Sequence, residues 1–161
     1  MTEWKNRIIG HGSESPDNLL AHPLNHRIHT RPQQEALGTV LDAVGVVQSV
    51  IVNQRTGFVV DGHLRISLAM RSGQKTIPVV YVDLSDEEES IVLASLDAIG
   101  AMAVEDKAMM HELIESIETE DAEIIKMLAA CVASETVPEI TEFEQEKERT
   151  PITCPQCGAS W

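Results

Sequence analysis

Three short segments rich in valine and isoleucine, set between turn and helix signals, constrain the fold of this chain more than any other feature. They are residues 46–52, 58–60 and 77–82. β-Branched runs of this length favour strands, and Pro78 indicates that the third lies at a sheet edge or has just begun. Between the second and third segments, Leu64, Leu68 and Ala69 share one face of a helix. Strands and helices at this spacing predict a small α+β domain.

Further helices are expected before and after these strands. Thr30 can cap a helix that ends ahead of the first strand. Ser85 and Glu88 form a capping box at the start of another apolar helix, which follows the third strand. Apolar stripes then predict two more helices, at about residues 105–117 and 121–133.

Composition divides the chain into four parts. Residues 1–17 are polar and contain two glycines and a proline, so we expect a flexible arm. Residues 18–100 hold the predicted strands and are expected to form the domain, and residues 101–133 a helical extension. Residues 134–161 are expected to be an acidic linker and a Cys-x-x-Cys tail.

The overall composition predicts a soluble, cytoplasmic protein. Hydrophobic residues make up 43% of the chain but aromatic residues only 3%, so the core must be aliphatic. No apolar run approaches the ~18 residues of a membrane span, and residues 1–10 have no apolar segment of the signal-peptide type. Three cysteines with one close pair do not make a disulfide framework.

The formal net charge of −14 is distributed unevenly. Residues 1–80 contain eight Lys/Arg against six Asp/Glu, a net of +2, whereas residues 81–161 contain four against twenty, a net of −16. Five of the six histidines also lie in the first half, so an anionic ligand is expected to bind there. The acidic second half opposes contact with nucleic-acid phosphates, so direct DNA binding is predicted to be weak or absent.

The strongest candidate site is the strand-to-helix turn at residues 61–65, which read Asp-Gly-His-Leu-Arg. Gly62 permits close backbone approach, and the N–H groups and dipole of the helix that begins there favour an anion. Arg65, about one turn into the helix, can reach phosphate oxygens with its planar guanidinium. The alternative is an ordinary strand-to-helix turn with an exposed arginine.

His63 and Asp61 are the candidate catalytic residues of this turn. The His63 imidazole titrates near neutral pH, so it can be a general acid or base, a hydrogen-bond donor to phosphate, or a solvent-facing side chain. Asp61 can cap the helix or hold a metal. A metal site that combines them with His22, His26 and His29 is a further alternative, although the spacing follows no standard pattern.

The order of these motifs resembles the N-terminal domain of ParB, in the ParB/sulfiredoxin superfamily, over about residues 18–104. Asn25 and Arg27, in the stretch His-Pro-Leu-Asn-His-Arg, match an extended N-P-x-x-x-R motif, and Gly62 and Arg65 match a G-x-x-R motif. The resemblance implies a small mixed sheet with packed helices, followed by a helical extension.

The resemblance also implies a nucleotide pocket. The residues implied are Asn25, Arg27, Gly62, His63, Leu64 and Arg65. The nucleotide is CTP in partition ParB proteins and ATP or ADP in other branches, with Mg²⁺ as an accompanying ion. Where ParB carries an E-N-x-x-R motif, only Asp97 remains here as a metal-facing residue. Sulfiredoxin requires a catalytic cysteine in the turn, where this chain has His63, so sulfiredoxin chemistry is excluded.

The form Gly-His-Leu-Arg is similar to stand-alone or phage-associated members of the superfamily, often found near DNA methyltransferases. The partners implied are therefore a DNA methyltransferase or another phage protein. Separately, Cys154 and Cys157 form a knuckle that supplies half of a zinc site. A second copy of the chain, as in a homodimer, or another protein would complete it, and the alternative is a tail with two free thiols.

Three functions are compatible with these features. The first is a ParB-like nucleotide-binding module that serves DNA metabolism, partition or a mobile element. The second is an enzyme of the same fold, namely an NTPase, a metal-dependent nuclease or a small-molecule kinase. The third is a non-catalytic adaptor that docks a partner through its acidic helices.

Overall fold

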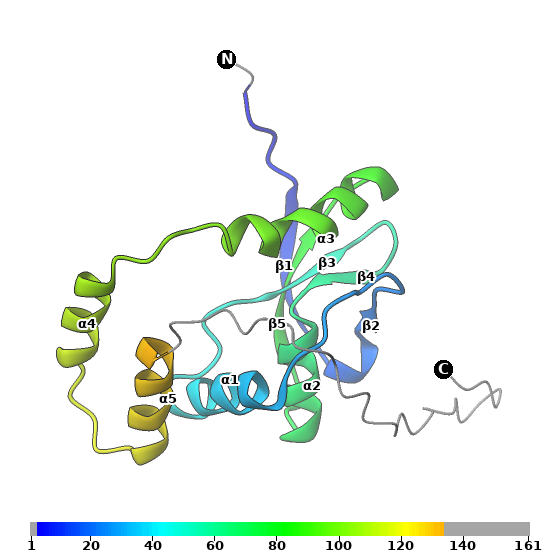
Figure 1. Ribbon diagram of the computed structural model, residues 1–161. Coiled ribbons are helices and arrows are strands. Elements are labelled where there is room, and N and C mark those ends of the chain that lie inside the picture. The colour runs from blue at the N-terminus through cyan, green and yellow to red at the C-terminus, as the bar shows by residue number, and fades with distance from the viewer. Residues whose placement is uncertain (1–2, 134–161) are drawn as a thin grey trace, which may run out of the picture.

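A mixed sheet forms the centre of the computed structural model, which describes residues 3–133 (Figure 1). Its strands are β1 (Ile8–Glu14), β2 (Leu20–Ala21), β3 (Val50–Asn53), β4 (Phe58–Asp61) and β5 (Ile77–Val82). Their spatial order is β1-β5-β3-β4-β2. The pairs β1–β5 and β3–β4 are antiparallel, whereas β3–β5 and β2–β4 are parallel. The predicted α+β class with a mixed sheet is confirmed.

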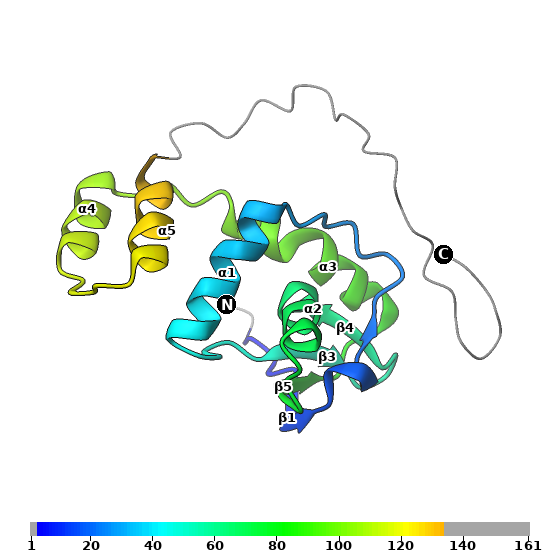
Figure 2. The same ribbon diagram turned by 90° about the horizontal axis from the view of Figure 1, so that it is seen from below.

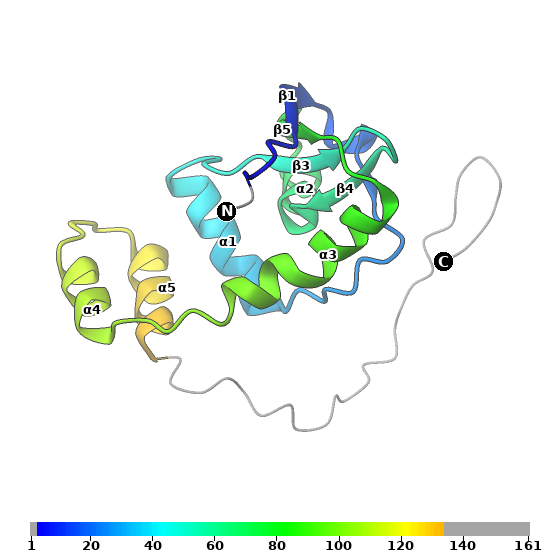
Figure 3. The same cartoon turned by 90° about the horizontal axis from the view of Figure 1, so that it is seen from above.

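The helices lie around this sheet. They are the 3-10 helix η1 (Pro16–Asn18), α1 (Arg31–Ala43), α2 (His63–Arg71), α3 (Asp86–Gly100), α4 (Lys107–Glu115) and α5 (Ala122–Ala133). Helices α2 and α3 lie on opposite sides of the sheet, and α4 and α5 pair with each other beyond α1 (Figures 2 and 3). No helix within residues 3–133 is long and apolar enough to cross a membrane.

The core is aliphatic, as the low aromatic content predicts. Valine and isoleucine side chains from three strands pack against α2, with Leu19 and Tyr81 at the margin. The buried cluster consists of Val50, Val52, Val59, Ile66, Ala69, Ile77 and Val79. The cluster fixes α2 against β3, and so fixes the strand-to-helix turn that precedes α2.

The first part of the chain is not the flexible arm that its composition predicted. Residues 8–14 form β1, which pairs along β5 from Ile8–Val82 to Glu14–Ile77. The glycines serve packing here, because a Cβ on Gly12 would lie 3.0 Å from Cε2 of Tyr81. The Tyr81 hydroxyl in turn donates to the Glu14 carboxylate at 2.5 Å.

The pairing of β1 with β5 also changes the interpretation of Pro78. The interpretation of β5 as an edge strand is wrong, because β1 covers that edge and places Ser13 opposite Pro78. The proline lies instead at the second residue of β5, where a strand start tolerates a missing N–H. The first predicted strand also begins later than expected, at Val50, because Val46 and Val47 are exposed and precede the ladder.

The predicted helix starts are confirmed in detail. The Thr30 hydroxyl accepts from the N–H of Gln33 at the start of α1. Ser85 and Glu88 form the reciprocal capping box at the start of α3. Such caps satisfy N–H groups that have no acceptor within the helix. The two later helices are shorter than predicted but lie at the expected places.

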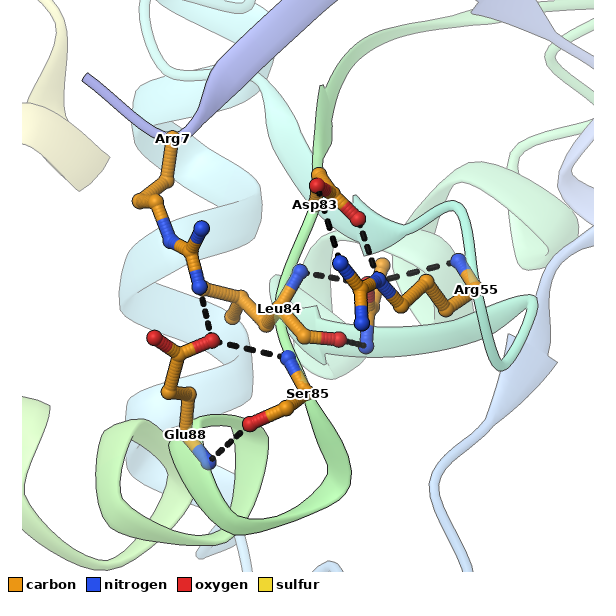
Figure 4. A network of polar contacts seen from close by, with 7 residues as sticks. Arg7, Arg55, Asp83, Leu84, Ser85 and Glu88 are labelled. Atoms are coloured by element: carbon orange, nitrogen blue, oxygen red, sulfur yellow. Dashed lines mark hydrogen bonds and ion pairs between the residues drawn. The ribbon is translucent and has the colours of Figure 1, made fainter. Parts of the chain in front are cut away.

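A polar network ties β1 to the junction between β5 and α3 (Figure 4). Arg7 pairs with Glu88, the same residue that closes the capping box of α3. Arg55, in the β3–β4 turn, forms a bidentate pair with Asp83. The chain before β1 and the start of α3 are therefore held to the same corner of the sheet.

Candidate functional site

The turn between β4 and α2 has a geometry that only glycine fits. Gly62 has φ +102°, in the left-handed region, and caps the helix that starts at His63. A Cβ at this position would lie 3.0 Å from Cγ2 and 3.2 Å from Cα of Val50. The backbone thus passes directly over β3, and the first N–H groups of α2, which have no acceptor within the helix, are left at the turn.

Two arginines converge on the carboxylate before this glycine. Arg65 donates from Nη2 to one oxygen of Asp61 at 2.6 Å, and Arg27 donates from Nη1 to the other at 3.2 Å. Between 13% and 16% of each of these three side chains is exposed. The expectation that Asp61 caps α2 is wrong, because both of its oxygens bind guanidinium groups and Gly62 is the cap residue.

The environment of Arg65 differs from that of an exposed arginine, which was the alternative interpretation of this turn. Its Nη1 donates to Gln48 at 3.0 Å, in the loop before β3. Its Nε is buried and has no hydrogen-bond partner within residues 3–133. The guanidinium is therefore a part of the packed turn, with its most direct contact to Asp61.

Arg27 joins the turn to α3. Its Nε forms an ion pair with the Asp97 carboxylate at 2.5 Å, and 58% of the Asp97 side chain is exposed. Arg27 lies in the extended segment just before α1. One arginine thus connects β4, α3 and the approach to α1.

No metal centre is assembled in the part of the chain that the structure describes. Residues 3–133 contain no group of three or more His, Cys, Asp or Glu side chains that could hold a metal ion. The alternative site built from His22, His26 and His29 is therefore wrong. The assignment of Asp97 as a metal ligand stays a prediction. Cys154 and Cys157 lie outside the described residues.

His63, the first residue of α2, is held as a neutral ring. Its Nε2 accepts from the backbone N–H of His22 at 3.3 Å, which places the hydrogen of a neutral imidazole on Nδ1. Burial lowers the pKa of His63, and the positive charge of Arg27 lowers it further, against the opposing effect of Asp61. This arrangement makes Nδ1 a hydrogen-bond donor and leaves Nε2 occupied.

A cavity of about 270 Å³ opens beside His63. Its polar lining is formed by Asn25, His29, His63 and Ser67, and its apolar lining by Leu19, Ala21, Ile66 and Met70. The structure therefore brings Asn25 to the same hollow as His63, and Arg27 to the same turn as Arg65. All six residues of the predicted nucleotide site belong to this turn or to the segment that packs on it.

The sequence interpretation missed a buried polar group behind the turn. Glu89 of α3 accepts from the Thr56 hydroxyl at 2.9 Å and lies 3.8 Å from Nε2 of His22. The signal was present in the spacing, because Glu89 precedes the buried Leu93 by four residues on one face of α3. A carboxylate on an apolar stripe indicates a buried partner rather than a solvated face.

No family model matches this sequence, and no curated protein matches it. Among solved structures, it is similar to the C-terminally truncated chromosome-partitioning protein ParB from Caulobacter crescentus, complexed with CTP-γ-S. The TM-score is 0.57 at 21% identity, over 74% of this chain and 71% of that chain.

Two structures of a pNOB8-like ParB N-domain match with a TM-score of 0.49 each. One is 19% identical over 84% of this chain and 52% of that chain, the other 15% identical over 99% and 56%. The mixed sheet, the glycine turn into α2 and the similarity to the Caulobacter structure agree: this chain has the fold of a ParB N-terminal domain.

Proposed function

We propose that this domain binds a nucleotide, with its phosphates at the start of α2. The observation that carries the proposal is the position of Arg27, which is brought from a separate segment to within 3.2 Å of the Asp61 carboxylate at the Gly62 turn. Cationic side chains beside the free N–H groups of a helix start form an anion-binding arrangement. The ParB structure of the same fold, which holds CTP-γ-S, supports a nucleotide as the anion.

The groups proposed to bind the phosphates differ in kind and in their position around the turn. The backbone N–H groups of His63, Leu64 and Arg65 point out of the first turn of α2 and can receive phosphate oxygens. The Nδ1 hydrogen of His63 adds a neutral donor, since its Nε2 is engaged by His22. Arg27, which contacts Asp61 at the same turn, supplies the positive charge. Arg65, held between Asp61 and Gln48, keeps the turn in shape.

The cavity next to His63 gives the rest of a nucleotide a place to bind. Asn25, His29 and Ser67 line its polar side, and these side chains can hydrogen-bond to sugar or base groups. We propose CTP first, because the ParB of known structure holds its analogue, and ATP or ADP as the alternatives. Because the fold is that of a ParB N-terminal domain, we propose that the module serves DNA metabolism, partition or a mobile element.

Calorimetric titration with CTP, ATP and pyrophosphate, each with and without Mg²⁺, tests this proposal. Arg27→Ala should weaken binding about 10- to 150-fold, because a charge-assisted contact contributes roughly 1.5–3 kcal/mol. Arg31→Ala is the matched control, since Arg31 is largely exposed and pairs with Glu35 within α1. Equal affinity in the two variants, both folded by circular dichroism, would contradict the site.

A second candidate function is a protein-docking adaptor, for which the apolar surface of the later helices is the supporting observation. Exposed side chains continue from the end of α3 into α4, namely Ile99, Met102, Val104, Met109 and Leu113. Surfaces of this kind favour association with another protein or a second copy. Light scattering over a range of concentrations, with Met109→Glu as the disrupting variant, tests self-association. An unchanged monomer mass at every concentration would exclude the homodimer.

A further inference from the structure

Two carboxylates contact the guanidinium of Arg27. Nη1 donates a hydrogen bond to Asp61 at 3.2 Å. Nε forms an ion pair with Asp97, whose carboxylate oxygen lies 2.5 Å away. A phosphate binds arginine most strongly when it accepts from two neighbouring N–H groups of the guanidinium. An incoming phosphate therefore has to compete with at least one of these carboxylates.

The two carboxylates differ in how readily they can leave. Asp61 is 13% exposed and also accepts from Arg65, so its removal would strand a buried charge. Asp97 is 58% exposed, pairs with Arg27 and returns to water when the contact breaks. Of the two carboxylates, Asp97 is therefore the one that a phosphate displaces more readily.

We propose that Asp97 is a displaceable counter-ion, whose place beside Nε of Arg27 is taken by a phosphate group of the ligand. This inference rests on the proposed function and adds to it a residue that sets affinity from outside the pocket. Asp97 keeps Arg27 pointed at the turn, and the ligand must compete with its carboxylate. The role is opposite in sign to that of a metal ligand, which was the assignment made from the sequence.

The variant Asp97→Asn distinguishes a displaceable counter-ion from a metal ligand. Pyrophosphate binding is measured by calorimetry in the presence of EDTA, so that no divalent metal takes part. The variant should bind about 2- to 5-fold more tightly than the wild type, which is the fold-change that corresponds to losing an exposed pair as competitor. Asp97→Glu restores the charge and should return the affinity towards that of the wild type.

Glu87→Gln is the control, because it removes one negative charge from the exposed face of the same helix. Equal tightening in Glu87→Gln would assign the effect to net charge and overturn the proposal. Unchanged or weaker pyrophosphate binding in Asp97→Asn would overturn it as well. Absence of binding in the wild type and in Asp97→Asn would instead refute the proposed function itself.

Discussion

The Nε2 atom of His22 lies 3.8 Å from a carboxylate oxygen of Glu89, with 9% and 3% of the two side chains exposed. Nδ1 of the same imidazole accepts from the N–H of Leu24 at 3.0 Å, and the ring packs edge-on against Phe58. Thr56 donates to the other oxygen of Glu89. This group joins the segment that carries Asn25 and Arg27 to α3 and to the β3–β4 turn.

Glu89→Ala should therefore reduce the free energy of unfolding by about 2–4 kcal/mol, because the buried His22 side chain and the partly buried Thr56 hydroxyl would lose their partner. Urea unfolding at pH 7 measures the loss. Glu87→Ala removes an exposed glutamate two residues earlier and should change stability by less than about 0.5 kcal/mol. A similar, small change in both variants would show that the buried group contributes little.

The turn glycine can be tested against another glycine of positive φ. Gly62→Ala should cost about 3 kcal/mol, since it adds contact with Val50 to the strain of a left-handed backbone. Gly73 has φ +68° with no atom within 4 Å of a Cβ position, so Gly73→Ala carries the strain alone, about 1 kcal/mol. Thermal and urea unfolding of both variants measure the difference. Equal losses of unfolding free energy would show that β3 accommodates the added methyl group without strain.

The neutral state of His63 predicts a specific pH dependence. Its folded pKa lies below the ordinary value of 6.5, so the unfolded chain binds the proton more readily. Stability from this residue is present above pH 6.5 and is lost as the pH falls towards the folded pKa. The free energy of unfolding, measured in urea at pH 7.5 and below pH 6, should fall less between the two pH values in His63→Gln than in the wild type. An identical fall in the two proteins would contradict this assignment.

Arg65 is expected to matter for stability as well as for binding. Arg65→Ala leaves Asp61 partly buried with Arg27 as its remaining partner, at a cost of about 2 kcal/mol in unfolding free energy. Arg71, on the same helix, is exposed and bonds to Gln34 at 2.7 Å. Arg71→Ala should therefore be nearly neutral. Melting temperatures of the two variants give the comparison, and a fully stable Arg65→Ala would assign Arg65 to ligand contact alone.

The local signals in the sequence predicted much of the fold. Thr30 and Ser85 identified helix starts because a cap depends on side chains within one turn. Gly62 marked the turn into α2 for a similar reason, since a strand that stops at glycine before a helical pattern has few other conformations. The expectation that the Arg27 segment meets this turn came from the resemblance to ParB, and the structure shows an Arg27–Asp61 contact there.

The contacts that were missed are those between distant segments. Gly10 and Gly12 look like flexible residues until Tyr81 is known to cover them, and nothing near β1 in the sequence shows that pairing. Asp61 resembled a helix cap because one of its partners, Arg27, lies thirty-four residues away in the sequence. Such partners depend on tertiary packing, which a pattern of single residues does not contain.

The pairing of β1 with β5 has a consequence for the order of events on the ribosome. Residues 8–14 are made before the other strands of the sheet, yet their partner strand is complete only once Val82 has been made. β3 and β4 can pair earlier, because only a short turn separates them. The backbone groups of β1 stay unpaired until β5 has been made. Closing this sheet edge is then a late step of synthesis, and a stalled chain that ends before β5 would expose both β1 and β3 to aggregation.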